Sequence, residues 1–299
     1  MSRDEILGMA SLVGGVGLFS TVEIASKIIG VRADPIVLTF IRFFLTGIML
    51  LILSIPLLRM RLQRFTMQDY GIFLLNGFIG IAVAISIFHV AILVLEKAAS
   101  AAVIFSVNPV FVLILARFIN DEAWTLRTWL AAVLGLSGVI CFACESGSFT
   151  MASFTGLGLM VLSAALFALS ICISRRVVPR YGAMVLMGYS SLFGSIMILP
   201  FALLRMDYQS TALLLDAWIP ILYLSIMGTA MAYALYYFGL LNTSAQKGGI
   251  TFFLKPVIAS ILAVIILGEG INAFMLAGTA LILSGLLLVL LVPGARKAQ

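Results

Sequence analysis

Long apolar runs separated by short polar segments occupy the chain from one end to the other. A helix needs about 20 apolar residues to cross the roughly 30 Å hydrocarbon core of a bilayer. Runs of that length predict ten transmembrane helices, at about 6–28, 35–57, 70–94, 98–119, 128–146, 154–174, 182–204, 217–240, 248–267 and 272–292. The pattern therefore predicts an all-α membrane protein. Its first run is longer than the core of a signal peptide, so we expect it to be retained as a helix.

The composition agrees with lipid as the solvent of this chain. Hydrophobic residues make up 63% of the sequence, charged residues only 10%, and the mean hydropathy is +1.21. A soluble domain carries about 25% charged residues. The net charge of +6 would suit a nucleic-acid partner, but the basic residues lie in short segments between the apolar runs. We therefore expect membrane lipid and no nucleic acid as a partner, and no obligate protein partner is evident.

The distribution of basic residues also predicts an orientation. If the N-terminus is cytoplasmic, twelve Lys and Arg residues fall in cytoplasmic segments, and four fall outside, at Lys27, Arg32, Lys97 and Arg205. Short cytoplasmic loops carry the excess of Lys and Arg in membrane proteins. We expect a multi-pass protein of the inner (plasma) membrane with both termini in the cytoplasm.

The sequence contains an internal repeat. At an offset of 147 residues, Ala98 aligns with Ala245, Phe105 with Phe252, Pro109 with Pro256 and Glu122 with Glu269, and the first spans of the two halves align more weakly near 148. Residues 1–147 and 148–299 then hold five spans each. Since five is odd, the second unit enters the membrane from the opposite side. Two inverted five-helix repeats are a recurring plan of secondary transporters, with the substrate site near the midplane between the halves.

A spaced motif within the repeat points to a family. Proline is followed by Glu after twelve residues and by small residues nine and sixteen positions later, as Pro109, Glu122, Ala131 and Gly138 and as Pro256, Glu269, Gly278 and Gly285. This resembles the paired EamA-type repeats of the drug/metabolite transporter superfamily in its ten-helix form. Ala131 departs from the expected glycine. In length, in its basic loop after the second span and in its aromatic spans, the chain looks most like bacterial exporters of aromatic amino acids. The resemblance implies export by alternating access through a central cavity.

Ionisable groups at membrane depth are the first candidates for a site, because lipid does not tolerate them. Lys255 lies about eight residues into the ninth span, and Pro256 leaves a carbonyl without its donor one turn back. A cation beside an aromatic ring and a freed carbonyl suits the carboxylate of an amino acid. The alternative is a lysine that snorkels to the interface. We expect Lys255 to bind the substrate carboxylate.

Two further polar residues are expected to line the cavity. Asn108 is the repeat counterpart of Lys255 and serves either as a cavity hydrogen bonder or as a tie between helices. His89 is the only histidine, and its repeat counterpart is Tyr236. We interpret His89 as a cavity residue rather than a proton carrier, and a lone histidine cannot form a metal site.

Glu23 and Arg42 lie in the outer halves of the first two spans, where pairing across the helices would make both tolerable. We interpret them as a gate or structural ion pair. Glu122 and Glu269 precede a helix, and we expect each to stabilise the N-terminus that follows it.

Aromatic side chains complete the predicted substrate site. Rings stack on flat substrates and attract cations, whereas packing of the protein core is the simpler explanation of any one ring. The candidates are Phe19, Tyr233, Tyr236 and Phe252.

The sequence holds no phosphate loop, nucleophile elbow or HExxH motif, so we expect no cofactor, no metal and no enzyme activity. Three alternatives stay open. A transporter of the same superfamily would carry other cargo, such as cationic drugs, other amino acids or sugar phosphates. A membrane-embedded enzyme would need clustered Asp, His or Cys at one depth. A passive channel or uniporter is also consistent with the sequence, in which no binding site for a coupling ion can be recognised.

Overall fold

The computed structural model describes residues 3–22, 25, 34–59, 65–94, 105–145, 154–206, 216–255, 257–258, 261, 265 and 273–290. Every regular element within these ranges is a helix. The first half of the chain carries α1 (Arg3–Ser20), α3 (Pro35–Arg59), α4 (Met67–Gly77), the π-helix η1 (Phe78–Ile85), α5 (Ser86–Val94), α7 (Asn108–Ile119) and α8 (Leu126–Glu145). The second half carries α9 (Phe154–Tyr181), α10 (Ala183–Arg205), α12 (Trp218–Ser225), the π-helix η2 (Ile226–Met231), α13 (Ala232–Asn242), α14 (Ala245–Thr251) and α16 (Ala273–Leu290).

The predicted all-helical class is confirmed for the described part of the chain, which is that of an integral membrane protein. Five of its helical segments are long and apolar enough to cross a membrane, namely Pro35–Pro56, Met67–Ala91, Thr155–Tyr181, Ala183–Arg205 and Trp218–Asn242. Shorter apolar helices cover Asn108–Ile119, Leu126–Cys141 and Leu276–Leu288. Each of these eight lies on a predicted span. The count of ten spans stays a prediction.

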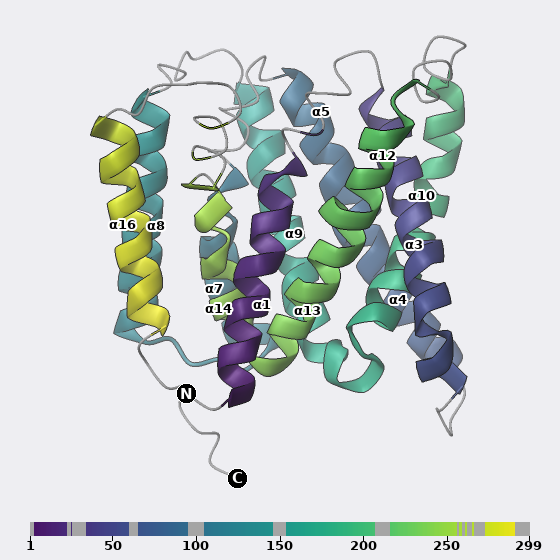
Figure 1. Cartoon of the computed structure of the whole chain (residues 1–299), viewed down its shortest axis with the longest axis horizontal. Coiled ribbons are helices and arrows are strands. Elements are labelled where there is room, and N and C mark those ends of the chain that lie inside the picture. Colours follow the sequence, from purple (N-terminus) through teal and green to yellow (C-terminus); the bar gives the residue numbers. More distant parts are fainter. Residues whose placement is uncertain are drawn as a thin grey trace.

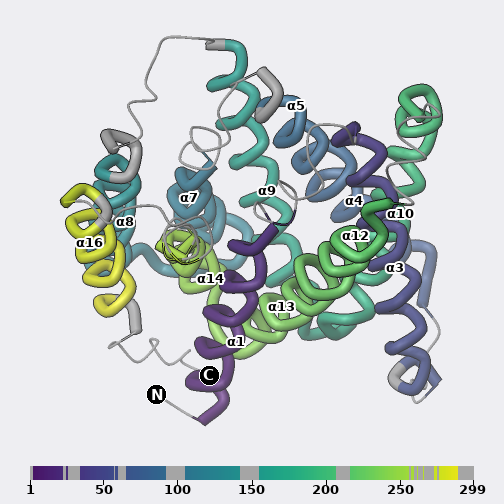
Figure 2. The backbone as a smooth tube through the Cα atoms, turned by 45° about the horizontal axis from the view of Figure 1, so that its top comes forward, coloured from purple at the N-terminus to yellow at the C-terminus, as the bar shows by residue number. Residues whose placement is uncertain are grey.

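Helices from the two halves of the chain pack against each other throughout the molecule. α3 packs along α10 at one end of the long axis, and α8 packs along α16 at the other (Figure 1, Figure 2). Between them, α1 packs against α13, α9 against η1 and α5, and α7 against α14. The middle of the molecule is therefore built by segments far apart in the sequence.

Small side chains permit the close approach of α1 to α13. A Cβ atom placed on Gly15 would lie 2.9 Å from the carbonyl oxygen of Ala232, so a larger residue would push the two helices apart. A matching contact joins α9 to η1, where the Ser163 hydroxyl donates to the carbonyl oxygen of Ala84 at 2.7 Å. Ser163 and Ala232 follow Gly15 and Ala84 by 148 residues each. Helices of the two halves thus meet at equivalent sequence positions.

Two of the helical runs contain a π-helical turn at equivalent places. η1 begins at Phe78 and η2 at Ile226, again 148 residues apart. π-Turns displace backbone groups from their regular partners and are frequent at functional sites. In η2, the carbonyl oxygen of Gly228 accepts a hydrogen bond from Arg42 at 3.2 Å. Apolar periodicity predicted both runs as helices but not these turns.

Candidate substrate site

Lys255 lies just beyond the end of α14 and is half-buried. Its Nζ atom is 6.0 Å from the ring centroid of Phe88 on α5 and 5.9 Å from that of Phe105, which precedes α7. At these distances the ring faces attract a cation, and the attraction grows where water is excluded. Both of these rings belong to the first half of the chain, whereas Lys255 belongs to the second.

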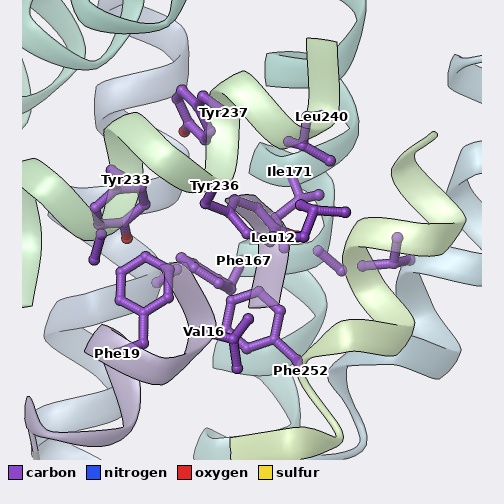
Figure 3. Close-up of a cluster of buried hydrophobic side chains, with 14 of the residues drawn as sticks. Leu12, Val16, Phe19, Phe167, Ile171, Tyr233, Tyr236, Tyr237, Leu240 and Phe252 are labelled. Atoms are coloured by element: carbon purple, nitrogen blue, oxygen red, sulfur yellow. The ribbon is translucent and has the colours of Figure 1, made fainter. Parts of the chain in front are cut away.

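Further rings continue from Phe105 into the middle of the molecule. Phe105 is 5.7 Å from Phe167 on α9, which meets Phe252 edge-on at 5.8 Å. Phe252 stacks on Phe19 at 5.8 Å and meets Tyr236 at 5.2 Å. Figure 3 shows four of these five rings gathered from four different segments. All five are buried.

Tyr233 extends this series of rings. It meets Phe19 edge-on at 4.8 Å and Phe43 of α3 at 6.3 Å. The close contact between α1 and α13 brings Phe19 to the two tyrosines. Phe19 follows Gly15 by about one turn, Tyr236 follows Ala232 by about one turn, and Tyr233 comes directly after Ala232. We call the rings of Phe105, Phe167, Phe252, Phe19, Tyr236 and Tyr233 the aromatic series. It joins Lys255 to the core between α1 and α13, and so brings together five of the predicted site residues.

Two predicted site residues carry buried oxygens that have no hydrogen-bond partner within the described part of the chain. The Tyr236 hydroxyl is one, and the Oδ1 atom of Asn108 is the other. Asn108 also donates from Nδ2 to the carbonyl oxygen of Ala164 at 2.7 Å, so it does tie α7 to α9. A buried polar atom without a partner destabilises a fold by roughly 1–3 kcal/mol, and such atoms in a native structure call for an explanation.

His89 lies beside Phe88 and contacts a residue of α3. Its Nδ1 atom lies 2.8 Å from the Thr39 hydroxyl of α3, and its ring is 5.5 Å from that of Phe88. It is half-buried. His89 therefore neighbours the Lys255 site through Phe88, and the hydrogen bond to Thr39 fixes its ring.

Arg42 contacts η2. Its Nε donates to the Thr229 hydroxyl, and its guanidinium lies 5.3 Å from the centroid of the Phe43 ring. The bond from Arg42 to Gly228 adds a second attachment, so Arg42 joins α3 to the π-turn. The predicted partner Glu23 lies outside the described residues, and the pair with it stays a prediction.

Phe88, Phe105 and Phe167 were missed as site residues. The repeat carried a signal for two of them, because Phe105 aligns with Phe252 at the offset of 147 and Phe167 aligns with Phe19 at 148. Each partner was already a candidate. Nothing in the sequence singled out Phe88, which reaches Lys255 only through the packing of separate helices.

Glu122 caps the N-terminus of a different helix from the one expected. Its carboxylate accepts from the backbone nitrogen of Ala245 at 2.6 Å and from that of Gln246 at 2.9 Å, at the start of α14 rather than of the following α8. Asp121, with a positive φ of 56°, turns the chain towards α14. Burial raises the pKa of Glu122, and the two hydrogen bonds and Arg175 oppose the rise. The expectation for the following helix was wrong for Glu122, and Glu269 lies outside the described residues.

Known proteins resemble this chain over nearly its whole length. The model of the EamA-like transporter family matches the chain twice, over residues 6–144 and 154–291. An uncharacterized transporter of Clostridium kluyveri is 27% identical over 273 residues, which cover 89% of this chain and 88% of the relative. The uncharacterized transporter YetK of Bacillus subtilis is 25% identical over 285 residues, covering 92% and 84%. A solved crystal structure of 18% sequence identity covers 98% of this chain and 99% of its own, with a TM-score of 0.80. That likeness shows a shared fold.

Proposed function

The chain belongs to the EamA-like transporter family, and we propose that it exports small amphiphilic metabolites, with aromatic amino acids as the preferred cargo. The relatives named above are transporters, which supports transport and leaves the cargo to be argued from the site. The single observation that carries the choice of cargo is the position of Lys255 at the end of the aromatic series.

An aromatic amino acid offers a group to each part of this site. Its carboxylate meets the ammonium of Lys255, and its ring stacks among Phe105, Phe167 and Phe252. An aromatic pair adds about 0.5–1.5 kcal/mol beyond the burial of its area. The unpartnered oxygens of Asn108 and Tyr236 supply hydrogen-bonding capacity for the substrate amine. His89 and Phe19 lie against the rings that flank the site.

The same proposal includes two inverted five-helix repeats, at residues 1–147 and 148–299. The twofold match of the family model and the equivalent positions of η1 and η2 support it. In this arrangement the substrate lies between the halves, since Phe19 and Phe105 belong to the first and Phe167 and Phe252 to the second. Alternating access then rocks one half against the other around the site.

We place both termini in the cytoplasm and the protein in the inner membrane. The excess of Lys and Arg in the predicted cytoplasmic loops supports this orientation. Glu23 and Arg42 belong to the outer gate in this scheme. The mechanism needs a small-molecule substrate and a lipid bilayer, and it needs neither a cofactor nor a protein partner.

The test is uptake of labelled amino acids into proteoliposomes of purified protein, with and without a proton gradient. We expect saturable uptake of tryptophan and phenylalanine, each competed by the other, and little uptake of glycine. Lys255→Met should abolish this uptake while the melting temperature in detergent is retained, and Lys255→Arg should keep part of it. Full uptake by Lys255→Met would overturn the role of Lys255. If the folded protein takes up cationic drugs but no amino acid, its cargo is a different class of molecule from the one proposed.

A further inference from the structure

A second group of aromatic rings surrounds Phe65, away from the aromatic series. The Phe65 ring centroid lies 5.5 Å from that of Phe73 and 6.0 Å from that of Tyr70, both on α4. It lies 5.9 Å from Tyr181 at the end of α9 and 5.9 Å from Tyr189 on α10. The interplanar angles are 90°, 80°, 65° and 86° in that order. Four rings thus enclose one phenyl ring edge-to-face, which is the geometry that aromatic pairs favour. We call this enclosure the Phe65 box.

Phe65 differs from the rings around it in its place along the chain. It precedes α4 and belongs to no helix, whereas all four surrounding rings are on or at the end of helices. Phe65, Tyr70 and Tyr189 are half-buried, while Phe73 is fully buried. The enclosed ring is therefore carried by a non-helical segment and packs, half-buried, against the core.

Charged groups adjoin the box. Asp69 accepts from the Tyr181 hydroxyl at 2.5 Å and lies 2.8 Å from the guanidinium of Arg180. Arg180 covers the face of the Tyr181 ring, with its Cζ atom 5.2 Å from the centroid. The Arg180 side chain is 65% exposed, whereas the Asp69 side chain is 4% exposed. Asp69 thus fixes a ring of the box and a cation beside it.

We propose that the Phe65 box is a second binding site for the phenyl or indole ring of an aromatic amino acid, and that Phe65 fills it when substrate is absent. The box already encloses the side-chain ring of phenylalanine, which is the direct evidence of fit. A bound substrate would place its ring where Phe65 lies and its carboxylate towards Arg180.

The inference rests on the proposed function for the class of ligand and for its direction of travel. The box lies where the segment after α3 enters α4, and the predicted orientation places that connection in the cytoplasm. An exporter loads its substrate from this side. The box would therefore receive aromatic substrates before they reach Lys255, and Phe65 would compete with them for it.

Thermal unfolding of the purified protein in detergent, titrated with L-phenylalanine, tests this site. Removing a competing side chain raises the apparent affinity by the reciprocal of the fraction of time that the site was free of it. We expect Phe65→Ala to lower the half-saturating phenylalanine concentration by at least about fivefold relative to wild type. Glycine should give no protection. Phe73→Ala is the matched control, because it removes a buried ring of the box and leaves Phe65 in place.

Two further variants keep the result interpretable. If Phe65→Ala does not fold, Phe65→Leu replaces it, with a smaller gain expected. Arg180→Gln should weaken binding of phenylalanine but not of phenethylamine, which lacks the carboxylate. Equal half-saturation in wild type and Phe65→Ala would overturn the proposal, as would equal protection of Phe65→Ala and Phe73→Ala.

The Lys255→Met variant separates this inference from the proposed function. Phenylalanine should still protect a protein that carries both Phe65→Ala and Lys255→Met, since the box does not include Lys255. Loss of protection in that double variant would show that binding occurs at Lys255 alone and would overturn the second site. Absence of amino-acid uptake by wild type, with protection of Phe65→Ala intact, would instead overturn the proposed export.

Discussion

Gly138 on α8 faces the backbone of Gly278 on α16 so closely that α8 has no room for a side chain at this position. A Cβ atom on Gly138 would lie 2.7 Å from the carbonyl oxygen of Gly278. The equivalent contact joins Gly285 to Ala131, where a Cβ atom would lie 2.8 Å from the carbonyl oxygen. These are the four small residues of the repeated motif, and their positions explain the spacing of seven, which returns to one helix face.

Gly138→Leu should therefore destabilise the contact between α8 and α16. Overpacking of this kind typically costs about 1–3 kcal/mol, and backbone on the opposite side cannot move aside as a flexible side chain would. We expect a lower melting temperature in detergent. Gly158→Leu on α9 is the matched control, since a Cβ atom there meets nothing within 4 Å. Equal melting temperatures for the two variants would contradict the packing argument.

Asp69 should stabilise the start of α4 more than an ordinary helix cap does. Its carboxylate accepts from the Thr66 backbone at 2.7 Å to close a capping box, and it also binds Tyr181 and Arg180. Loss of a cap alone costs about 1 kcal/mol. We expect Asp69→Ala to lose about 2 kcal/mol or more in unfolding free energy, because the hydrogen bond from Tyr181 and the ion pair with Arg180 are lost together with the cap.

Thr66→Ala is the comparison for Asp69→Ala, because it removes the cap and keeps the carboxylate with its two other partners. Melting temperatures of both variants, with Tyr181→Phe as a third, measure the difference. If Thr66→Ala and Asp69→Ala lose the same amount, the contacts to α9 contribute nothing.

Much of the fold could be predicted from the sequence, because a helix that crosses the lipid bilayer needs an apolar run of about 20 residues. Every long apolar helix of the described chain falls on a predicted span. The repeat also identified contacts, since residues 148 apart occupy equivalent places around η1 and η2. The π-turns themselves were not predicted, because an apolar run reads the same at 3.6 and at 4.4 residues per turn. Gly80 and Gly228, equivalent within the two turns, were the available hint.

The site was predicted less completely, and the reason is geometric. Lys255 was recognisable as a charged residue inside an apolar span, and Phe252 as an aromatic residue one turn before it. Phe88 became a partner of Lys255 only through the packing of separate helices, in which α5 and α7 both contact α9. The Phe65 box draws on three helices and a connecting segment, none of which marks the others in sequence. Only Thr66 and Asp69 carried a local signal there, as a capping pair.

Glu122 should make stability depend on pH in a defined direction. Burial holds its pKa above the ordinary value of 4.5, so the folded state binds this proton more tightly than the unfolded state does. Its contribution to stability is then highest below about pH 4.5 and is lost as pH rises through the folded pKa. Charge on Arg175 and the nitrogens of Ala245 and Gln246 limits the effect.

The measurement is the melting temperature of wild type minus that of Glu122→Gln, followed upward from about pH 4.5. We expect this difference to become less favourable to wild type as pH rises, since glutamine does not titrate. Subtraction removes the other carboxylates, which are common to both proteins. A difference that grows with pH would show that the hydrogen bonds to α14 outweigh burial.

Tyr236 and Tyr237 offer a test that separates function from stability. The Tyr236 hydroxyl is buried without a partner, whereas the Tyr237 hydroxyl accepts from Ser174 at 2.9 Å. Removing an unpartnered buried hydroxyl relieves a desolvation cost, so Tyr236→Phe should leave the melting temperature unchanged or raise it. Tyr237→Phe should lower unfolding free energy by about 1 kcal/mol, because it breaks a buried hydrogen bond.

Uptake of labelled tryptophan should rank the two variants in the opposite order. If the Tyr236 hydroxyl binds the substrate amine, Tyr236→Phe removes a hydrogen bond that forms only when substrate is bound. The loss of about 1–2 kcal/mol of binding free energy raises the half-saturating concentration of tryptophan about 5- to 30-fold. Tyr237→Phe should transport nearly as well as wild type. A stable Tyr236→Phe protein with unchanged half-saturation would exclude its hydroxyl from the substrate site. The packing of the Tyr236 ring would then compensate the unfavourable burial of its hydroxyl.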